Sequence, residues 1–170
     1  MHITIGNDVE FILTRGTKPI SSIGLVGGSK AFPSPVPRGA LQEDNVLAEI
    51  NIYPAKTSDI WETNISTVVK ALIERLPRDV ALSRLASAIY PAAQLTDPRA
   101  LEFGCDPDVN AWTQRQNEFI NPPKRLIRLR SAGGHVHIGI PALTEKKGFE
   151  LIRCLDSFVG LQGVLVDTDA

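Results

Sequence analysis

The sequence has no surplus of either charge, few cysteines and no long apolar run. Its 18 Lys and Arg residues are balanced by 19 Asp and Glu residues, which gives a net charge of −1. Domains that bind nucleic acid usually carry a basic surplus, so we expect no nucleic acid as a partner. No stretch approaches the ~20 apolar residues that a membrane-spanning helix needs. We therefore expect no association with a membrane.

The chain has only two cysteines, Cys105 and Cys154, which share no metal-binding spacing. Two distant cysteines do not form a disulfide framework, and a reducing compartment is the usual setting for such a chain. The opening residues 1–5 carry neither a basic leader nor the apolar stretch of a signal peptide. These features predict a cytoplasmic protein.

The 170 residues are 43% hydrophobic, which is ordinary for a globular protein and long enough for one domain with a substantial core. We expect a single domain over residues 1–170, interrupted by a flexible Pro- and Gly-rich loop at 27–39. Gly27-Gly28-Ser29-Lys30 within this loop faintly resembles a phosphate loop, but it lacks the spacing and no helix follows. The apolar residues 164–166 precede Asp-Thr-Asp, which predicts that more chain normally follows.

The first candidate strand, residues 1–14, alternates aliphatic and polar side chains. Asp8 and Glu10 lie two apart, so in a strand they point to the same side. Neighbouring carboxylates repel each other unless a cation or a proton lies between them. A solvated strand face and a metal site are therefore both open for this stretch.

The next candidate strand, residues 41–53, carries Glu49 and Asn51 on its polar side. Glu49 is either an exposed side chain on a solvated sheet or a ligand aimed at the same site as Glu10. Glu43 and Asp44 are expected at the strand entrance, where both can be simply solvated.

The third candidate strand, residues 132–140, holds His135 and His137 two residues apart between glycines. Both imidazoles would face one side, while the alternating aliphatic residues would face a core. The pattern fits a hairpin strand with two half-exposed histidines as well as it fits a functional site that uses both imidazoles.

Helical spacing of apolar residues predicts helices over 58–76 and 144–160. Residues 80–96 are ambiguous between strand and helix. Together with the alternating segments, including shorter strands at 20–26 and 124–131, this predicts an α+β protein with a mainly antiparallel sheet and helices packed on one face.

If the three acidic and histidine strands share a sheet, one face carries carboxylates and imidazoles. Hard oxygen ligands with one or two imidazoles suit Mg²⁺ or Mn²⁺ better than structural zinc. Arg130 is predicted near the same face, where its guanidinium would hold a phosphate or a carboxylate in a bidentate fork. This set of residues is typical of phosphoryl transfer.

Several motifs resemble those of one enzyme superfamily. Residues 6–11 (Gly-Asn-Asp-Val-Glu-Phe) are similar to the Gly-x-Glu-x-Glu-Phe strand of the glutamine synthetase and glutamate–cysteine ligase superfamily. Residues 48–51, followed by Pro54, resemble its second acidic strand, and 134–139 resemble its His-x-His strand. In combination the chain most resembles the phage-type (type 2) carboxylate–amine ligases. Further matching segments are 42–45, 104–112 and 130–135.

The resemblance implies a glutamine synthetase-like catalytic fold and ATP-dependent formation of an amide or peptide bond through an acyl phosphate. Glu10 and Glu49 resemble ligands of the metal near the acyl substrate. Asp8 and His135 resemble ligands of the metal that bridges the ATP phosphates. His137 resembles the histidine that contacts those phosphates.

The resemblance also implies partners and a setting. The substrates would be a small-molecule or peptide carboxylate and an amine, and a homo-oligomer is possible because such sites often lie near subunit contacts. A phage-encoded ligase would work in the host cytoplasm. Position 8 carries Asp where the superfamily has Glu, which would shift the metal. Glutamine synthetases have two acids in the middle strand, and Glu43 is a candidate for the second.

The superfamily also uses arginines and a late acidic strand beyond the histidine strand and its helix. The chain ends before such a segment, so we expect weak or no catalysis from this chain alone. One alternative is a non-catalytic remnant that binds a nucleotide or a partner. Another is a cupin-like metal oxygenase, which the predicted helices disfavour because cupins are nearly all strand.

Overall fold

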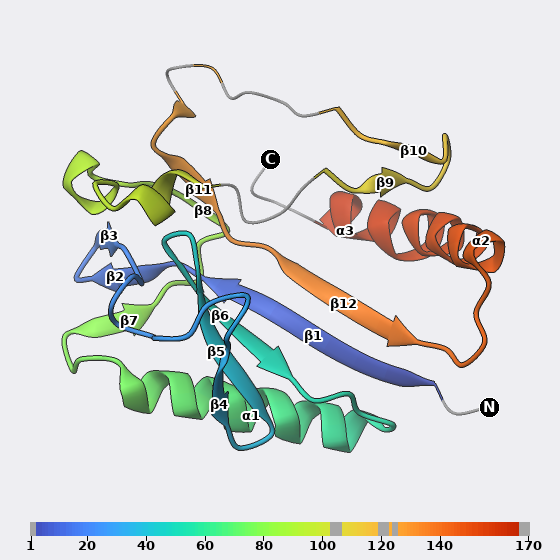
Figure 1. Cartoon of the computed structure of the whole chain (residues 1–170), viewed down its shortest axis with the longest axis horizontal. Coiled ribbons are helices and arrows are strands. Elements are labelled where there is room, and N and C mark those ends of the chain that lie inside the picture. The colour runs from blue at the N-terminus through green and yellow to red at the C-terminus, as the bar shows by residue number, and fades with distance from the viewer. Residues whose placement is uncertain (1–2, 103–106, 119–122, 124–125, 167–170) are drawn as a thin grey trace. The chain divides into compact units, whose positions relative to one another are not determined.

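The computed structural model is shown in Figure 1, and it describes residues 3–102, 107–118, 123 and 126–166. The chain divides into two compact units, the first made of Met1–Gly104 with Pro122–Ile140 and the second of Cys105–Asn121 with Pro141–Ala170. Its elements are mainly antiparallel strands with two longer helices. The predicted α+β class with mainly antiparallel strands is thus confirmed.

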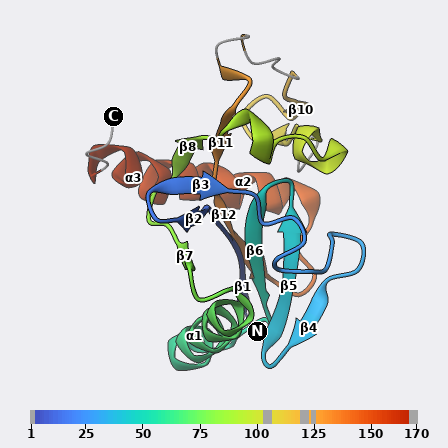
Figure 2. The same cartoon turned by 90° about the vertical axis from the view of Figure 1, so that its left-hand side faces the viewer.

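The first unit is built on a five-stranded sheet with the order β12-β1-β6-β5-β4, in which every neighbouring pair is antiparallel (Figures 1 and 2). Strand β1 lies between the histidine strand β12 and the acidic strand β6. The bounds are β1 Thr4–Phe11, β4 Ser34–Val36, β5 Gly39–Asp44, β6 Leu47–Ile52 and β12 Gly134–Gly139.

Two smaller sheets complete the strands of this unit, one with the order β3-β2-β7 and one that pairs β11 with β8. Two short 3₁₀ helices, η1 and η2, follow β8. The bounds are β2 Leu13–Arg15, β3 Lys18–Ile20, β7 Val80–Leu82, β8 Ser87–Ile89, η1 Ala92–Gln94, η2 Pro98–Leu101 and β11 Leu129–Ser131.

The helix predicted over 58–76 is confirmed as α1, Ser58–Arg75. Thr57 caps its start, because the Thr57 side chain accepts a hydrogen bond from the backbone N–H of Ile60, and Leu76 is already extended. The helix buries Val68 and Leu72 against the apolar face of the sheet, together with the aliphatic residues of β5 and β6. This packing leaves the opposite face of the sheet to polar side chains.

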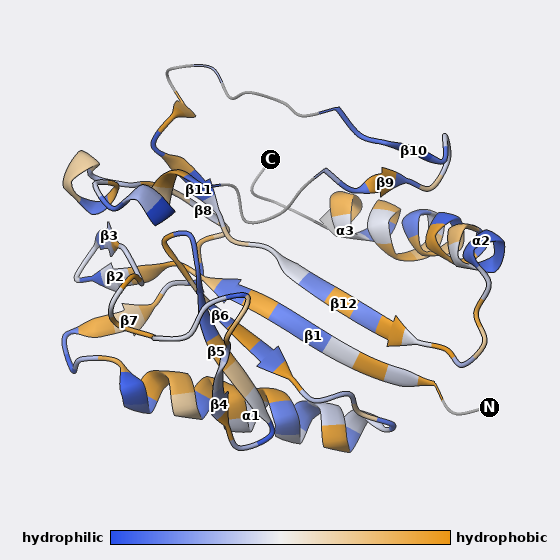
Figure 3. Cartoon of the chain, viewed as in Figure 1, coloured by the Kyte–Doolittle hydropathy of each residue, from blue (hydrophilic) through white to orange (hydrophobic). Residues whose placement is uncertain are grey.

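Hydrophobic and hydrophilic residues alternate along β1 and β6, as the banding in Figure 3 shows. Ile50 and Ile52 are buried on the side of α1. Asn7 also belongs to this side and is satisfied there, since its side chain donates to the backbone oxygen of His135 at 2.8 Å and accepts from Trp61 Nε1 at 2.7 Å. These two bonds fasten the histidine strand and α1 to β1.

The second unit contains a two-stranded ribbon and a helical segment. Thr144 caps α2 as predicted for a helix beginning at 144, and Trp112 Nε1 donates to Asp156 Oδ2 at 2.9 Å. One π-helical turn separates α2 from α3. The bounds are β9 Val109–Asn110, β10 Arg115–Gln116, α2 Glu145–Leu155, the π turn Asp156–Gly160 and α3 Leu161–Val166.

Three of the predicted strands are wrong in detail, and within the stretch 124–131 the strand β11 covers Leu129–Ser131. The stretch 41–53 is a hairpin, because Asn45 adopts a left-handed backbone (φ 56°) and turns the chain between β5 and β6. The predicted strand at 20–26 ends at Ile20, after which Gly24 (φ 80°) and the bond from Ser22 Oγ to the backbone oxygen of Leu47 hold a turn. The loop predicted over 27–39 contains the short strand β4.

No helix among the residues that the structure describes is long and apolar enough to cross a membrane. The five-stranded sheet of the first unit is open, with β12 and β4 at the two ends of its order, and α1 covers one face. This arrangement differs from the closed, nearly all-strand barrel of a cupin.

Candidate functional site

The antiparallel register brings the predicted site residues to one side of the sheet. Asp8 lies opposite both His135 and Asn51, and Glu10 lies directly opposite Glu49. Paired residues of an antiparallel ladder point to the same face. We call this side, with Asp8, Glu10, Gln42, Asp44, Glu49, Asn51, His135 and His137, the polar face.

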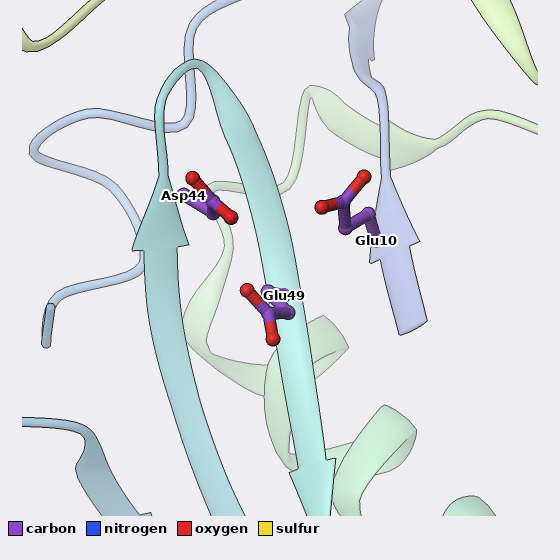
Figure 4. Close-up of side chains that lie close together, drawn as sticks. All are labelled: Glu10, Asp44 and Glu49. Atoms are coloured by element: carbon purple, nitrogen blue, oxygen red, sulfur yellow. The ribbon is translucent and has the colours of Figure 1, made fainter. Parts of the chain in front are cut away.

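Three carboxylates from three adjacent strands form the first group on this face. Glu10 on β1, Glu49 on β6 and Asp44 on β5 each place a carboxylate oxygen within 4.8 Å of the other two (Figure 4). Like charges this close destabilise one another unless a proton or a cation intervenes. We call these three residues the carboxylate cluster.

Glu49 is the most buried member of the cluster, with 5% of its surface exposed. Burial raises the pKa of the Glu49 carboxyl to about 7, and the charges of Asp44, Asp8 and Glu10 push it in the same direction. Opposing them, Gln42 Nε2 donates to Glu49 Oε2 at 2.7 Å and stabilises the charged form. Glu49 is therefore an acid whose charge the protein alone does not fully compensate.

Glu10 is held in place by the segment that precedes the histidine strand. The backbone N–H of Gly133 donates to Glu10 Oε2 at 2.7 Å, and the N–H of Glu10 donates to the oxygen of Gly133 at 2.9 Å. Burial raises the pKa of the Glu10 carboxyl, the Gly133 hydrogen bond lowers it, and Asp44 raises it again. These two bonds leave Glu10 Oε1 for another partner.

A second group, the aspartate–histidine group, lies beside the cluster on the same face. His135 Nδ1 is 3.3 Å from Asp8 Oδ1, and His137 Nε2 is 3.2 Å from Asp8 Oδ2. Both imidazoles are largely exposed, at 64% and 63% of their side-chain surface. Gly6 lies opposite His137, so no side chain from that position covers the ring. The two histidines therefore share one carboxylate, and the geometry does not separate their roles.

Two buried polar atoms on the polar face have no hydrogen-bond partner within the described chain. They are Asp8 Oδ1, which His135 Nδ1 approaches without hydrogen-bond geometry, and Asn51 Nδ2 on the neighbouring strand. Buried polar atoms normally have a hydrogen-bond partner, so a buried oxygen without one is a candidate ligand for a metal ion. The oxygen donors of the carboxylate cluster fit a hard divalent cation such as Mg²⁺ or Mn²⁺, and Asp8 Oδ1 beside His135 offers a second position for one.

Asp44 is the member of the cluster that the sequence did not single out. It was expected at a strand entrance, but the turn at Asn45 brings the end of β5 back beside β6. Glu43, the candidate for a second acid of the middle strand, belongs to the other side. Its carboxylate accepts from the N–H groups of Gly24 at 2.8 Å and Gly27 at 2.9 Å. The alternation of β5 was the available signal, because Gln42 and Asp44 share a face.

Arg130 lies outside both groups. Its Nη1 donates to the backbone oxygens of Ile127 and Leu129, its Nη2 to that of Ala100 and its Nε to Asn45 Oδ1, at distances of 2.8 to 3.3 Å. The guanidinium thus ties η2, β11 and the β5–β6 turn together. The bidentate phosphate fork expected of Arg130 stays a prediction, and these bonds would have to open for it.

Replacing Asp44 and Glu43 separately tests whether Asp44 binds a metal ion while Glu43 only stabilises the neighbouring loop. Asp44→Asn is expected to weaken Mn²⁺ binding at least about tenfold, since it removes an oxygen ligand of the cluster. Glu43→Gln is expected to leave Mn²⁺ affinity unchanged but to lower the free energy of unfolding by about 1–2 kcal/mol, because it weakens charge-assisted bonds to the loop. Calorimetric titration and urea denaturation measure the two effects. Equal Mn²⁺ affinity in both variants would contradict the three-carboxylate site.

Comparisons of this chain with protein-family models, with curated proteins and with solved structures gave no match. The resemblance to carboxylate–amine ligases therefore rests on its sequence motifs, and the chemistry of the site rests on the geometry of the polar face.

Proposed function

We propose that this chain provides the metal- and ATP-binding face of a carboxylate–amine ligase that forms amide or peptide bonds through an acyl phosphate. One observation carries the proposal: the carboxylate cluster and the aspartate–histidine group are adjacent on one sheet face. Two neighbouring sets of hard ligands suit an enzyme that holds ATP phosphates through divalent cations. The motif resemblance likewise assigns Glu10 and Glu49 to one metal and Asp8 and His135 to the other.

In this proposal the carboxylate cluster holds one ion, and Asp8 with His135 holds another. Bound Mg²⁺ or Mn²⁺ would neutralise the negative charge that develops on the phosphates. His137, whose imidazole is 63% exposed, donates a hydrogen bond to a phosphate oxygen. Gly133 keeps Glu10 oriented through its N–H.

The reaction has two balanced steps. An oxygen of the substrate carboxylate attacks the γ-phosphorus of ATP, the bond from this phosphorus to ADP breaks, and ADP leaves. The nitrogen of the amine then attacks the acyl carbon, the carbon–oxygen bond to phosphate breaks, and phosphate leaves while the nitrogen loses its proton. Positioning and electrostatic stabilisation supply most of the catalysis in such transfers.

A second candidate function is ATP binding without catalysis. The observation that favours it is the engagement of Arg130, whose three nitrogens all donate to other parts of the first unit. Phosphoryl transfer normally uses a positive group over the transferred phosphoryl. A chain with its candidate arginine occupied would bind Mg-ATP and turn it over slowly or not at all.

Calorimetric titration with ATP in the presence and absence of Mg²⁺ tests the proposal. We expect metal-dependent binding that Glu10→Gln and His135→Ala weaken at least about tenfold, because each removes a ligand. Glu62→Gln, an exposed change on α1 away from the polar face, is the matched control and should bind as the unaltered chain does. Failure of Mg-ATP to bind the unaltered chain would refute both candidates.

Trapping the activated acyl group separates the two candidate functions. Hydroxylamine converts an acyl phosphate to a hydroxamate, so the chain is incubated with Mg-ATP, hydroxylamine and a panel of carboxylates. Hydroxamate and ADP in equal amounts support the ligase. Mg-ATP binding with no ADP release across the panel supports the binding function.

A further inference from the structure

A pocket of about 240 Å³ in the first unit adjoins the carboxylate cluster. The pocket is lined by residues 28–31, by the end of β5 with the β5–β6 turn, and by Arg99 of η2 with Glu102. Asp44 belongs to both the pocket and the cluster. We call this cavity the turn pocket. A molecule bound in it would lie next to whatever the cluster binds.

The volume of the turn pocket limits its occupant. Pockets for drug-sized ligands range over about 300–1,000 Å³. The turn pocket is smaller than this, so it accepts a compact group such as a short amine or one amino-acid side chain. A nucleotide does not fit within it.

The net charge of the lining residues determines which charge a bound group should carry. Three acids, Glu43, Asp44 and Glu102, line the pocket with two bases, Lys30 and Arg99. The lining therefore carries one more negative than positive charge, before the nearby Glu10 and Glu49 are considered.

The arginine in the wall is already directed at carboxylates. Arg99 Nη1 donates to Glu43 Oε2 at 3.2 Å, and its Nε and Nη2 donate to Asp97 at 3.1 and 3.0 Å. Glu43 in turn is bonded to the loop through Gly24 and Gly27. Arg99 is thus shared between Glu43 and Asp97, and the remaining charged residues of the lining are Asp44, Glu102 and Lys30, which together carry one net negative charge.

Glu102 is anchored at this wall by its own backbone. Asn45 Nδ2 donates to the backbone oxygen of Glu102, and Asn45 Oδ1 accepts from Arg130 Nε at 3.3 Å. This chain of bonds holds Glu102 beside the turn that carries Asp44. Carboxylates in the lining of a small cavity can accept the charge-assisted hydrogen bonds that an ammonium group donates.

We infer that the turn pocket binds the amine substrate as a primary ammonium group, with Glu102 and Asp44 as its acceptors. This inference rests on the proposed ligase function for the role of the amine, but the binding itself needs no ATP. The bound ammonium would lie beside the cluster at which the acyl group is activated, and it must give one proton to a neighbouring carboxylate before its nitrogen can attack the acyl carbon and lose the second proton. Glu102 then decides which amines are accepted.

Three probes of similar size and different charge test the inference on the full chain loaded with Mg²⁺: ethylammonium, propionamide and propionate. Backbone amide resonances of Gly28 and Asn45, which both line the pocket, report binding by NMR titration. We expect saturable shifts with ethylammonium, weaker shifts with propionamide and none with propionate. Saturable shifts with propionate at equal or lower concentration would overturn the inference.

Substitution of Glu102 adds a second readout. Glu102→Gln is expected to weaken ethylammonium binding about two- to fivefold, the range of an exposed ion pair. Glu102→Lys should abolish this binding, and the control Glu62→Gln should not change it. Unchanged affinity in both Glu102 variants would refute the assignment.

The outcomes separate this inference from the proposed function. If Mg-ATP binds the chain and ethylammonium does not, the pocket assignment is wrong and the ligase proposal stands. If ethylammonium binds at the turn pocket and Mg-ATP fails to bind, the ligase proposal is wrong and the pocket is an ammonium site of another protein class. Glu102→Gln should retain Mg-ATP affinity, since Glu102 is no member of the carboxylate cluster.

Discussion

Replacing Glu49 by glutamine is expected to stabilise the metal-free protein above pH 7 and to remove its divalent-cation site. In the folded chain, burial and the charges of Asp44, Asp8 and Glu10 raise the pKa of Glu49 from 4.5 to about 7. Above pH 7 the folded state must therefore carry a buried charge that the unfolded state solvates freely. Glutamine keeps the shape of the side chain and has no such charge.

The pH dependence of stability follows from the same shift. Between pH 4.5 and about 7 the folded protein binds a proton at Glu49 that the unfolded chain has already released. Stability from this group is thus fully present below the unfolded pKa and is lost as the pH rises through the folded pKa. One pKa unit corresponds to ~1.4 kcal/mol, and partial hydration reduces the total, so the loss is about 1–3 kcal/mol. Glu49→Gln should be more stable than the unaltered chain at pH 8 by this amount and equally stable at pH 4.5.

Urea denaturation at pH 4.5 and pH 8 in the presence of a chelator measures this effect. Added Mg²⁺ should raise the stability of the unaltered chain at pH 8, because a ligand that binds only the folded state stabilises it. The same Mg²⁺ should stabilise Glu49→Gln less than the unaltered chain, because only the group of Asp8 with His135 is left to bind it. Glu62→Gln serves as the control for loss of one exposed carboxylate. A Glu49→Gln variant that is less stable than the unaltered chain at pH 8 would show that the cluster carries no uncompensated charge.

Much of the polar face was predictable because strands have an exact period of two. Alternation predicted that the carboxylates and imidazoles lie on one face if their strands share a sheet. The strands do share one, and the register pairs Glu10 with Glu49 and Asp8 with His135. Alternation is a local property, and the register of the ladder decides which residues of neighbouring strands share a face.

The residues that sequence reasoning missed depend on the path of the chain rather than on alternation. Asp44 joins the cluster because a single left-handed residue, Asn45, divides one predicted strand into a hairpin. Asn can adopt this conformation, yet neither residue type nor pattern demands it there. Arg130 was expected near the polar face, but its guanidinium donates to the backbone oxygen of Ala100 and to the side chain of Asn45, both far away in the sequence. Such long-range hydrogen bonds leave no periodic signal in the sequence.

Replacing Gly39 by alanine is expected to destabilise the protein more than any other single change considered. An added Cβ at this position would collide with the backbone oxygen of Asn51 on β6 and would lie 2.9 Å from Val68 Cγ2 on α1. Neither neighbour can move cheaply, since Asn51 is part of a sheet ladder and Val68 is fully buried. Overpacking of this kind typically costs 1–3 kcal/mol, and a backbone collision adds to it, so we expect a loss of at least about 3 kcal/mol.

Gly39→Ala should also weaken metal binding at the carboxylate cluster. Gly39 begins β5, and Asp44 ends it, so a strand pushed away from β6 at one end alters the distance between Asp44 and Glu49 at the other. Gly39→Ala is therefore expected to lose Mn²⁺ affinity even where urea denaturation shows that it is still folded. Gly16→Ala is the matched control, because that glycine has a positive φ of 61° but no neighbour within 4 Å. It should cost only about 1 kcal/mol and leave Mn²⁺ binding intact. A Gly39→Ala protein with normal Mn²⁺ affinity would mean that the carboxylate cluster does not depend on the close contact between β5 and β6.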